Sequence, residues 1–207
     1  MALTDEQKNF LAPRISSHGV GLNVLEGRTF GPDTHNGPMI ISNDPARDNL
    51  GSQPIRVESL QHMKALAGVP DSHFDARPGS DAHLTYLPPP TANFAKHLAD
   101  ANGDRCKLQS IVHHDDAHNV SQQMRTYVLG DSRKVAPEYV DMANAMHFPM
   151  MATYTPGEDI VITSANPLII DSSWPSSLVF GRITIKSGGY IQTNTQVSIT
   201  ANEIISL

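Results

Sequence analysis

Apolar residues recur at helical spacing in several parts of the first 154 residues. In residues 57–70 they fall on one side of a helix, which Gly68 is expected to end. A second helix is predicted over residues 92–103, with Thr91 as its N-cap. Between residues 16 and 55 glycines and prolines interrupt every period, which predicts loop or extended chain held in place by another surface.

The last 53 residues have a different pattern. They are rich in Ile, Val, Thr, Ser and Asn, which is a strand composition, and they contain few charges. The six charged residues are Glu158, Asp159, Asp171, Arg182, Lys186 and Glu203. We therefore place a boundary near Thr155 and predict a β-rich module over residues 155–207.

Two β architectures fit this module. Ile162, Ile183 and Ile204 are 21 residues apart, as are Leu178 and Ile199, and this period is typical of a short β-solenoid. The alternative is a small sandwich or meander of antiparallel hairpins, with residues 187–189 forming one of the turns. The predicted fold class is α+β: a helical, loop-rich region over residues 1–154, followed by the β-rich module.

Composition narrows the possible functions. A formal net charge of −6 argues against general nucleic-acid binding, which requires a basic surface. The single cysteine excludes an intrachain disulfide. No apolar run is long enough for a membrane span, and the first residues do not resemble a secretory signal. We expect a protein that is cytoplasmic at synthesis, with export without a cleaved signal or incorporation into a larger particle left open.

The stretch VHHDDAHNV, residues 112–120, is the one candidate metal site. His114 and His118 are four residues apart, and His113 is adjacent, so the pattern fits a surface metal site or a metal-dependent hydrolase. However, the apolar stripe changes sides near residue 114. We therefore predict a break after residues 107–112, which would form a strand or turn, and a new helix capped by Asp115 or Asp116 that runs to Leu129.

Two further groups of residues bear on activity. VLGDSRK, residues 128–134, resembles the Gly-Asp-Ser block of the SGNH hydrolases, but no histidine follows at the spacing of that family. A helix ending at Gly130, followed by a capping Ser132, explains the stretch without chemistry. No complete nucleotide-binding motif is present, so no cofactor is assigned.

Three functions remain, and assembly is favoured among them. About 50 residues with so few charges bury too little surface alone, so we expect a structural protein and homo-oligomer that self-associates or docks to a partner through this module. The first alternative is a lectin-like, carbohydrate-binding module in which Trp174 and Tyr190 contact a glycan. The second is the metal-dependent hydrolase described above.

Overall fold

The computed structural model describes residues 4–16 and 27–207, which form two compact units. One unit combines the chain up to Arg56 with Met151–Leu207, and the other is Val57–Met150. The sequence predicted a single division between residues 154 and 155. In the structure the N-terminal segment instead joins the C-terminal strands, and the helical unit is inserted between them.

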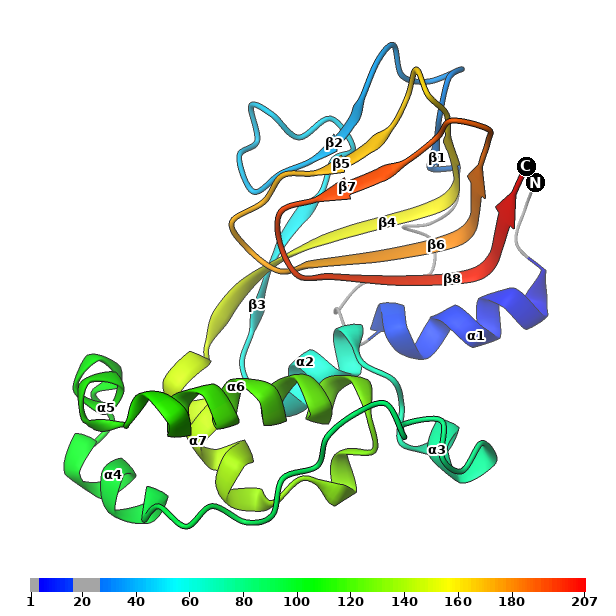
Figure 1. Ribbon diagram of the computed structural model, residues 1–207. Helices are drawn as coiled ribbons and strands as arrows, with labels where there is room; N and C mark the ends of the chain where they lie inside the picture. The colour runs from blue at the N-terminus through cyan, green and yellow to red at the C-terminus, as the bar shows by residue number, and fades with distance from the viewer. Residues whose placement is uncertain (1–3, 17–26) are drawn as a thin grey trace. The chain divides into compact units, whose positions relative to one another are not determined.

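The inserted unit is helical (Figure 1). Ser59 caps the first of its helices, and its side chain accepts a hydrogen bond from the amide of His62. Asn93 rather than Thr91 caps the next predicted helix, which ends at Asn102 in the left-handed conformation. The helices and helical turn are α2 (Leu60–Ala67), α3 (Ser72–Ala76), α4 (Phe94–Ala101), α5 (Arg105–Ile111), α6 (His114–Leu129), η2 (Ser132–Lys134) and α7 (Pro137–His147).

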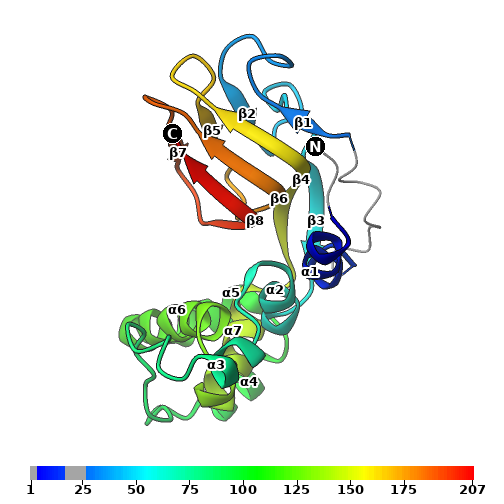
Figure 2. The same cartoon turned by 90° about the vertical axis from the view of Figure 1, so that its right-hand side faces the viewer.

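The other unit is built mainly from strands that pair in parallel and alternate between two sheets (Figure 2). The larger sheet has the order β1-β4-β6-β8, with β3 also paired to β4, and the smaller has the order β2-β5-β7. The strands are β1 (Thr29–Phe30), β2 (Met39–Ile41), β3 (Gln53–Val57), β4 (Met150–Ile162), β5 (Leu168–Ile170), β6 (Ser176–Ile185), β7 (Ile191–Thr193) and β8 (Val197–Ser206).

This topology is a short β-solenoid. From β4 to β8 the chain moves from one sheet to the other at each turn, and each strand lies in register beside the strand one coil earlier. The antiparallel interpretation was therefore wrong, because residues 187–189 do not fold β7 back onto β6. Instead, they lead into β7, which pairs with β5.

The 21-residue period holds for only one of the two coils. Leu178 pairs with Ile199 and Ile183 with Ile204, as predicted. One coil earlier the spacing is 23 residues, so Ile162 pairs with Ile185 and not with Ile183. The difference arises at one turn, since residues 171–175 connect β5 to β6 whereas only residues 194–196 connect β7 to β8.

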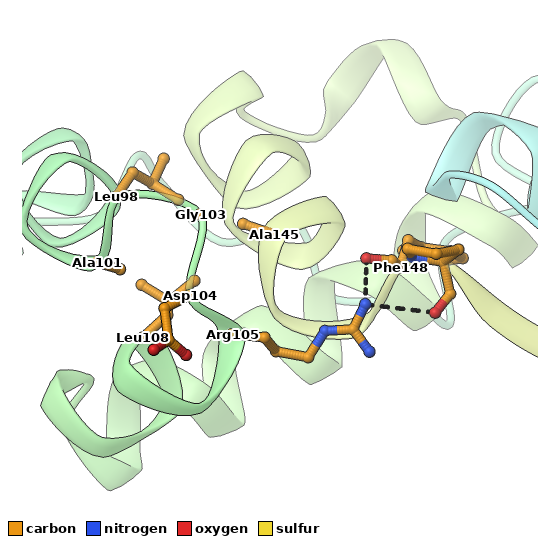
Figure 3. A pocket seen from close by; sticks show the side chains of 9 residues that line it. Leu98, Ala101, Gly103, Asp104, Arg105, Leu108, Ala145 and Phe148 are labelled. Carbon is orange, nitrogen blue, oxygen red and sulfur yellow. Dashed lines mark hydrogen bonds between the residues drawn. The ribbon is translucent and has the colours of Figure 1, made fainter.

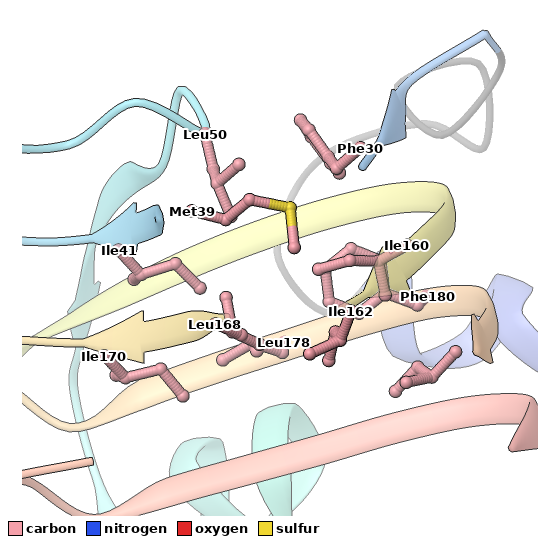
Figure 4. Close-up of a cluster of buried hydrophobic side chains, with 11 residues drawn as sticks. Phe30, Met39, Ile41, Leu50, Ile160, Ile162, Leu168, Ile170, Leu178 and Phe180 are labelled. Atoms are coloured by element: carbon pink, nitrogen blue, oxygen red, sulfur yellow. The ribbon is translucent and has the colours of Figure 1, made fainter. Parts of the chain in front are cut away.

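The N-terminal strands complete the solenoid's core (Figure 4). Strand β2 pairs with β5 and β1 with β4, so the described part of the irregular segment is indeed held by another surface. At Gly157 the chain passes between two rings, because an added Cβ would lie 2.6 Å from Phe180 and 2.7 Å from Phe30. The buried apolar cluster contains Phe30, Met39, Ile41, Leu50, Ile160, Ile162, Leu168, Ile170, Leu178, Phe180 and Ile183.

Helix α1 (Asp5–Ser16) packs against β6 and β8. It continues past Pro13, although a proline removes one backbone hydrogen bond from a helix. Leu11 of α1 is fully buried, and so is Val179 of β6, whose neighbours Leu178 and Phe180 belong to the core. Because side chains alternate along a strand, Val179 faces outward, and its burial indicates that the outer face of β6 is covered.

We predict very different costs for two alanine substitutions at one level of the solenoid. Ile183→Ala should lower the free energy of unfolding by about 2–5 kcal/mol, since it leaves a cavity in a packed core. Ile204→Ala, at the paired position on β8, should cost less than about 1 kcal/mol, because 64% of Ile204 is exposed. Trp174 fluorescence during urea unfolding of dilute protein measures the free energy of unfolding of each variant. Equal losses would contradict the difference in burial between the two paired positions.

Candidate functional site

The C-terminal end of the solenoid is open. Strand β8 is the last strand of the larger sheet and β7 the last of the smaller one, and no further strand in the described part of the chain pairs with either. In a β-strand the backbone groups that point away from a neighbour remain available for another strand. The ten-residue strand β8 therefore forms a long edge that pairs with no further strand in the described part of the chain.

Core residues become more exposed toward this end. In one inward-facing row, the exposed fraction is 0% for Ile160, 2% for Ile183 and 64% for Ile204, which lie in register on β4, β6 and β8. In a second row, Leu178 is fully buried and Ile199 is 38% exposed. The last coil thus carries core side chains that have a neighbour on one side only.

The N-terminal end is closed by the chain itself. Asn49 accepts a hydrogen bond from the amide of Ile40 through Oδ1 (2.7 Å), and its own amide donates to the Ile40 carbonyl oxygen (3.0 Å). Its Nδ2 donates to the carbonyl oxygen of Pro38 (2.9 Å). The next residue, Leu50, is buried in the core. Asn49 therefore occupies the outer edge of β2 much as another strand would, and the two ends of the solenoid differ.

The open strand β8 carries one ionisable side chain, and that side chain already has a hydrogen-bond partner. Glu203 is the one ionisable residue of β8, and it accepts a hydrogen bond from Nε of Arg182 at 2.8 Å. Arg182 also lies 3.9 Å from Asp159, so one charged side chain from each of three neighbouring strands of the larger sheet forms a row. The hydrogen bond to Glu203 raises the pKa of Arg182 further above its ordinary value. Little electrostatic repulsion protects the edge.

The structure does not bring Trp174 and Tyr190 together. Trp174 lies in the turn before β6, half-buried, and its carbonyl oxygen accepts a hydrogen bond from Thr195. Tyr190 lies in the turn after β6 and is 48% exposed. The ten-residue strand between these turns spans about 30 Å. The two rings therefore cannot bind the same sugar residue.

The histidine cluster lies at the start of α6. His113 is the N-cap, and its Nδ1 accepts a hydrogen bond from the amide of Asp115, so the cap is His113 and not Asp115 or Asp116. The predicted break before this helix is present, but it separates α6 from another helix, α5, and not from a strand. His114 and His118 are exposed on α6. In residues 4–16 and 27–207, no three His, Cys, Asp or Glu side chains gather closely enough to hold a metal ion.

Ser132 lies in a polar network of the helical unit, in which its hydrogen-bond partner is a carboxylate and not a histidine. Its hydroxyl donates to Asp71 Oδ2 at 2.6 Å, and Lys64 Nζ lies 3.0 Å from Asp71 Oδ1. Lys64 also donates to the carbonyl oxygens of Tyr127 and Gly130. Burial alone would raise the pKa of Asp71, but the hydrogen bonds from Ser132 and Lys64 lower it. The serine proton is thus held by a carboxylate, and the network fastens a loop to the end of α6.

A second polar group lies nearby in the same unit. Asp81 accepts hydrogen bonds from Lys134 Nζ (2.7 Å) and the Tyr86 hydroxyl (2.5 Å), which lower its pKa to about 2. The Tyr86 oxygen accepts a hydrogen bond from the amide of Asp131. Burial and the Asp81 hydrogen bond raise the pKa of Tyr86 above its ordinary value. These contacts fix the loop before α4 to the segment around η2.

One pocket of about 380 Å³ lies among α4, α5 and α7 (Figure 3). Its wall includes Leu98, Ala101, Leu108 and Phe148. The Arg105 guanidinium points toward the end of α7, where it donates to the carbonyl oxygens of Phe148 and Pro149. The pocket is therefore mainly apolar, and its cation is already engaged by backbone.

The architecture is a two-sheet parallel β-solenoid interrupted by a helical insertion. Comparison with protein-family models, with curated proteins and with solved structures finds no significant match to this chain. Within the described ranges, no helix has the length and apolar character to cross a bilayer. The open end could have been found from the sequence only by placing Ile199 and Ile204 on the last coil, since nothing in their local sequence marks them as exposed.

Lowering the pH should weaken the helical unit through Asp81. Its pKa is depressed to about 2 from 3.8, so its contribution to stability is complete above pH 3.8 and is lost as the pH falls through 2. Asp81→Asn should therefore unfold at lower urea concentration than the parent near neutral pH, and this gap should narrow near about pH 2.

Helical circular dichroism during urea unfolding measures the gap. Asp141→Asn, an exposed position on α7, is the matched control and should stay within about 0.5 kcal/mol of the parent at both pH values. A gap for Asp81→Asn that does not change with pH would contradict the assigned role.

Proposed function

We propose that this protein is a structural, assembly-type protein that associates through the open C-terminal end of its solenoid. The observation that carries the proposal is the row Ile160, Ile183 and Ile204, whose exposed fraction rises from 0% to 2% to 64%. A solenoid needs a cap at each end to remain a soluble single chain. Here Asn49 and Leu50 supply a cap at one end, and the described chain supplies none at the other.

The expected energetics require pairing along the whole strand. Fully burying an exposed isoleucine contributes about 1.5–3 kcal/mol, so Ile199 and Ile204, already partly covered, contribute at most about 3–6 kcal/mol from each copy that buries them. Association costs at least about 4 kcal/mol in lost freedom of motion. The two side chains of one copy alone therefore leave little net affinity. Backbone hydrogen bonds along β8 and contacts of the adjacent turns are needed for a stable complex.

The alternatives have less support. Glycan binding by Trp174 and Tyr190 would use two rings on different turns, and Trp174 is already half-buried. A metal-dependent hydrolase would require more ligands than His113, His114 and His118 bring together in the described structure. The proposal therefore remains with assembly.

Two lysines on the open edge should abolish association. In the variant Ile199→Lys with Ile204→Lys, each charge would be buried without a partner in the complex, at a cost of about 3–5 kcal/mol. We expect association at least about 100-fold weaker than that of the parent, measured as native mass by light scattering over a concentration series.

Ile111→Lys is the matched control, because Ile111 is an exposed isoleucine on the helical unit. It should associate like the parent. A parent protein that is monomeric throughout the micromolar range, or a double-lysine variant with unchanged mass, would refute assembly through this end.

A further inference from the structure

The two ends of the solenoid do not match each other. Strand β8 presents ten residues, whereas the N-terminal end presents the two-residue β1, the five-residue β3 and a β2 edge that Asn49 occupies. Head-to-tail stacking would have to place β8 against these short and blocked edges. A closed two-fold arrangement uses the same open end of both molecules, so it needs no complementary edge elsewhere.

Apart from Ala201, the inward-facing positions of β8 are symmetric about its centre. Val197, Ile199 and Ala201 lie in register with Ser176, Leu178 and Phe180, and Ile204 lies in register with the core residue Ile183. The pairing skips one position at Asn202, which shifts the alternation of the strand by one residue.

Reversal about the point between Ala201 and Asn202 therefore maps the inward positions onto inward positions, except Ala201, which exchanges with Asn202. Ile199 exchanges with Ile204, and Val197 with Ser206. The outward positions Thr200 and Glu203 also exchange. Without the skipped position, an antiparallel partner in this register would place inward side chains opposite outward ones.

We propose, on the basis of the assembly function above, that the open end binds a second copy of this chain through antiparallel pairing of the two β8 strands about a two-fold axis. In this pair Ile199 lies opposite Ile204 of the other copy, and the two solenoid cores become continuous. The result is a mixed sheet, with parallel strands in each molecule and one antiparallel pair at the junction.

Charge permits this arrangement. The two Glu203 side chains are three positions apart along the paired strands, about 10 Å. That separation is about one Debye length at physiological ionic strength, so their repulsion is largely screened. Each Glu203 also keeps its hydrogen bond from Arg182. Opposite each Glu203 is the uncharged Thr200 of the other copy.

Disulfide trapping distinguishes this register from others. On a Cys106→Ser background, which removes the exposed native thiol, Ile199→Cys and Ile204→Cys are made as separate proteins. Opposed residues in an antiparallel pair have Cα atoms about 4.5–5.5 Å apart, within the range that a disulfide spans. Two copies of the same variant place their thiols five positions apart, about 17 Å, which is too far.

We expect oxidation of the equimolar mixture to give a disulfide-linked dimer, with at least about tenfold less from either variant alone. Ile111→Cys on the same background is the control for random collision and should give no dimer above that low level. If either cysteine on β8 weakens association under reducing conditions, the pair Thr200→Cys and Glu203→Cys tests the same register from the outer face.

The outcomes separate the two proposals. The parent protein could associate and lose association in the variant Ile199→Lys with Ile204→Lys. If the single cysteine variants then gave dimers, or the mixture gave none, the two-fold register would be overturned and assembly left intact. A monomeric parent would overturn both. A dimer by native mass with the heterologous disulfide would establish the pairing.

Discussion

The solenoid unit depends on one constraint: an inward-facing side chain is buried only when a coil lies on each side of it. Ile160 and Ile183 meet this condition, since β4 has β1 and β6 as neighbours and β6 lies between β4 and β8. Burial of their apolar area favours folding, and the turns between strands need only be long enough to return the chain to the next position. The constraint also explains why each end of the stack requires something different from its middle. Asn49 and the loop that carries it cover the outer edge of β2, whereas no segment of the described chain covers the edge of β8.

In the helical unit, polar networks anchor the long loops between short helices. It is inserted between β3 and β4, and it has its own buried residues, such as Phe94, Tyr139 and Met142. Long connections cross this unit between its short helices, and their backbone groups need partners. Lys64 and Asp81 serve that purpose, because each ties a loop to the segment near η2. The clustering of ionisable groups around Ser132 is therefore explained by loop anchoring, without a catalytic role.

Local patterns predicted the fold class and several elements, whereas contacts between distant segments escaped prediction. The change of apolar face near residue 114 correctly located the break before α6, and the pairs 178 with 199 and 183 with 204 were correct. Strands β1 and β2 were missed because two or three residues carry no period, and their partners lie more than 120 positions away. The 23-residue coil was not recognised because the turn at residues 194–196 is shorter than the turn at residues 171–175. This difference makes the spacing of paired residues differ between the two coils. The sequence also placed the proposed association surface in the C-terminal module, but it assigned no residue to the open edge.

The small number of charged residues in the last quarter of the chain has different causes in its first strands and in β8. Its first strands are sheltered by β1, β2 and β3, so low charge there reflects ordinary burial on the parallel sheets. On β8 the same explanation fails, because Ile199 and Ile204 are exposed and Glu203 is the one charge along ten residues. Soluble proteins usually protect such an edge with lysine, proline or a bulge that faces solvent. The irregularity that β8 does have, at Asn202, leaves the strand's inward positions, apart from Ala201, symmetric about its centre. A symmetric edge closes after two molecules, so an unprotected strand of this kind is compatible with a defined dimer and does not require an open-ended fibre.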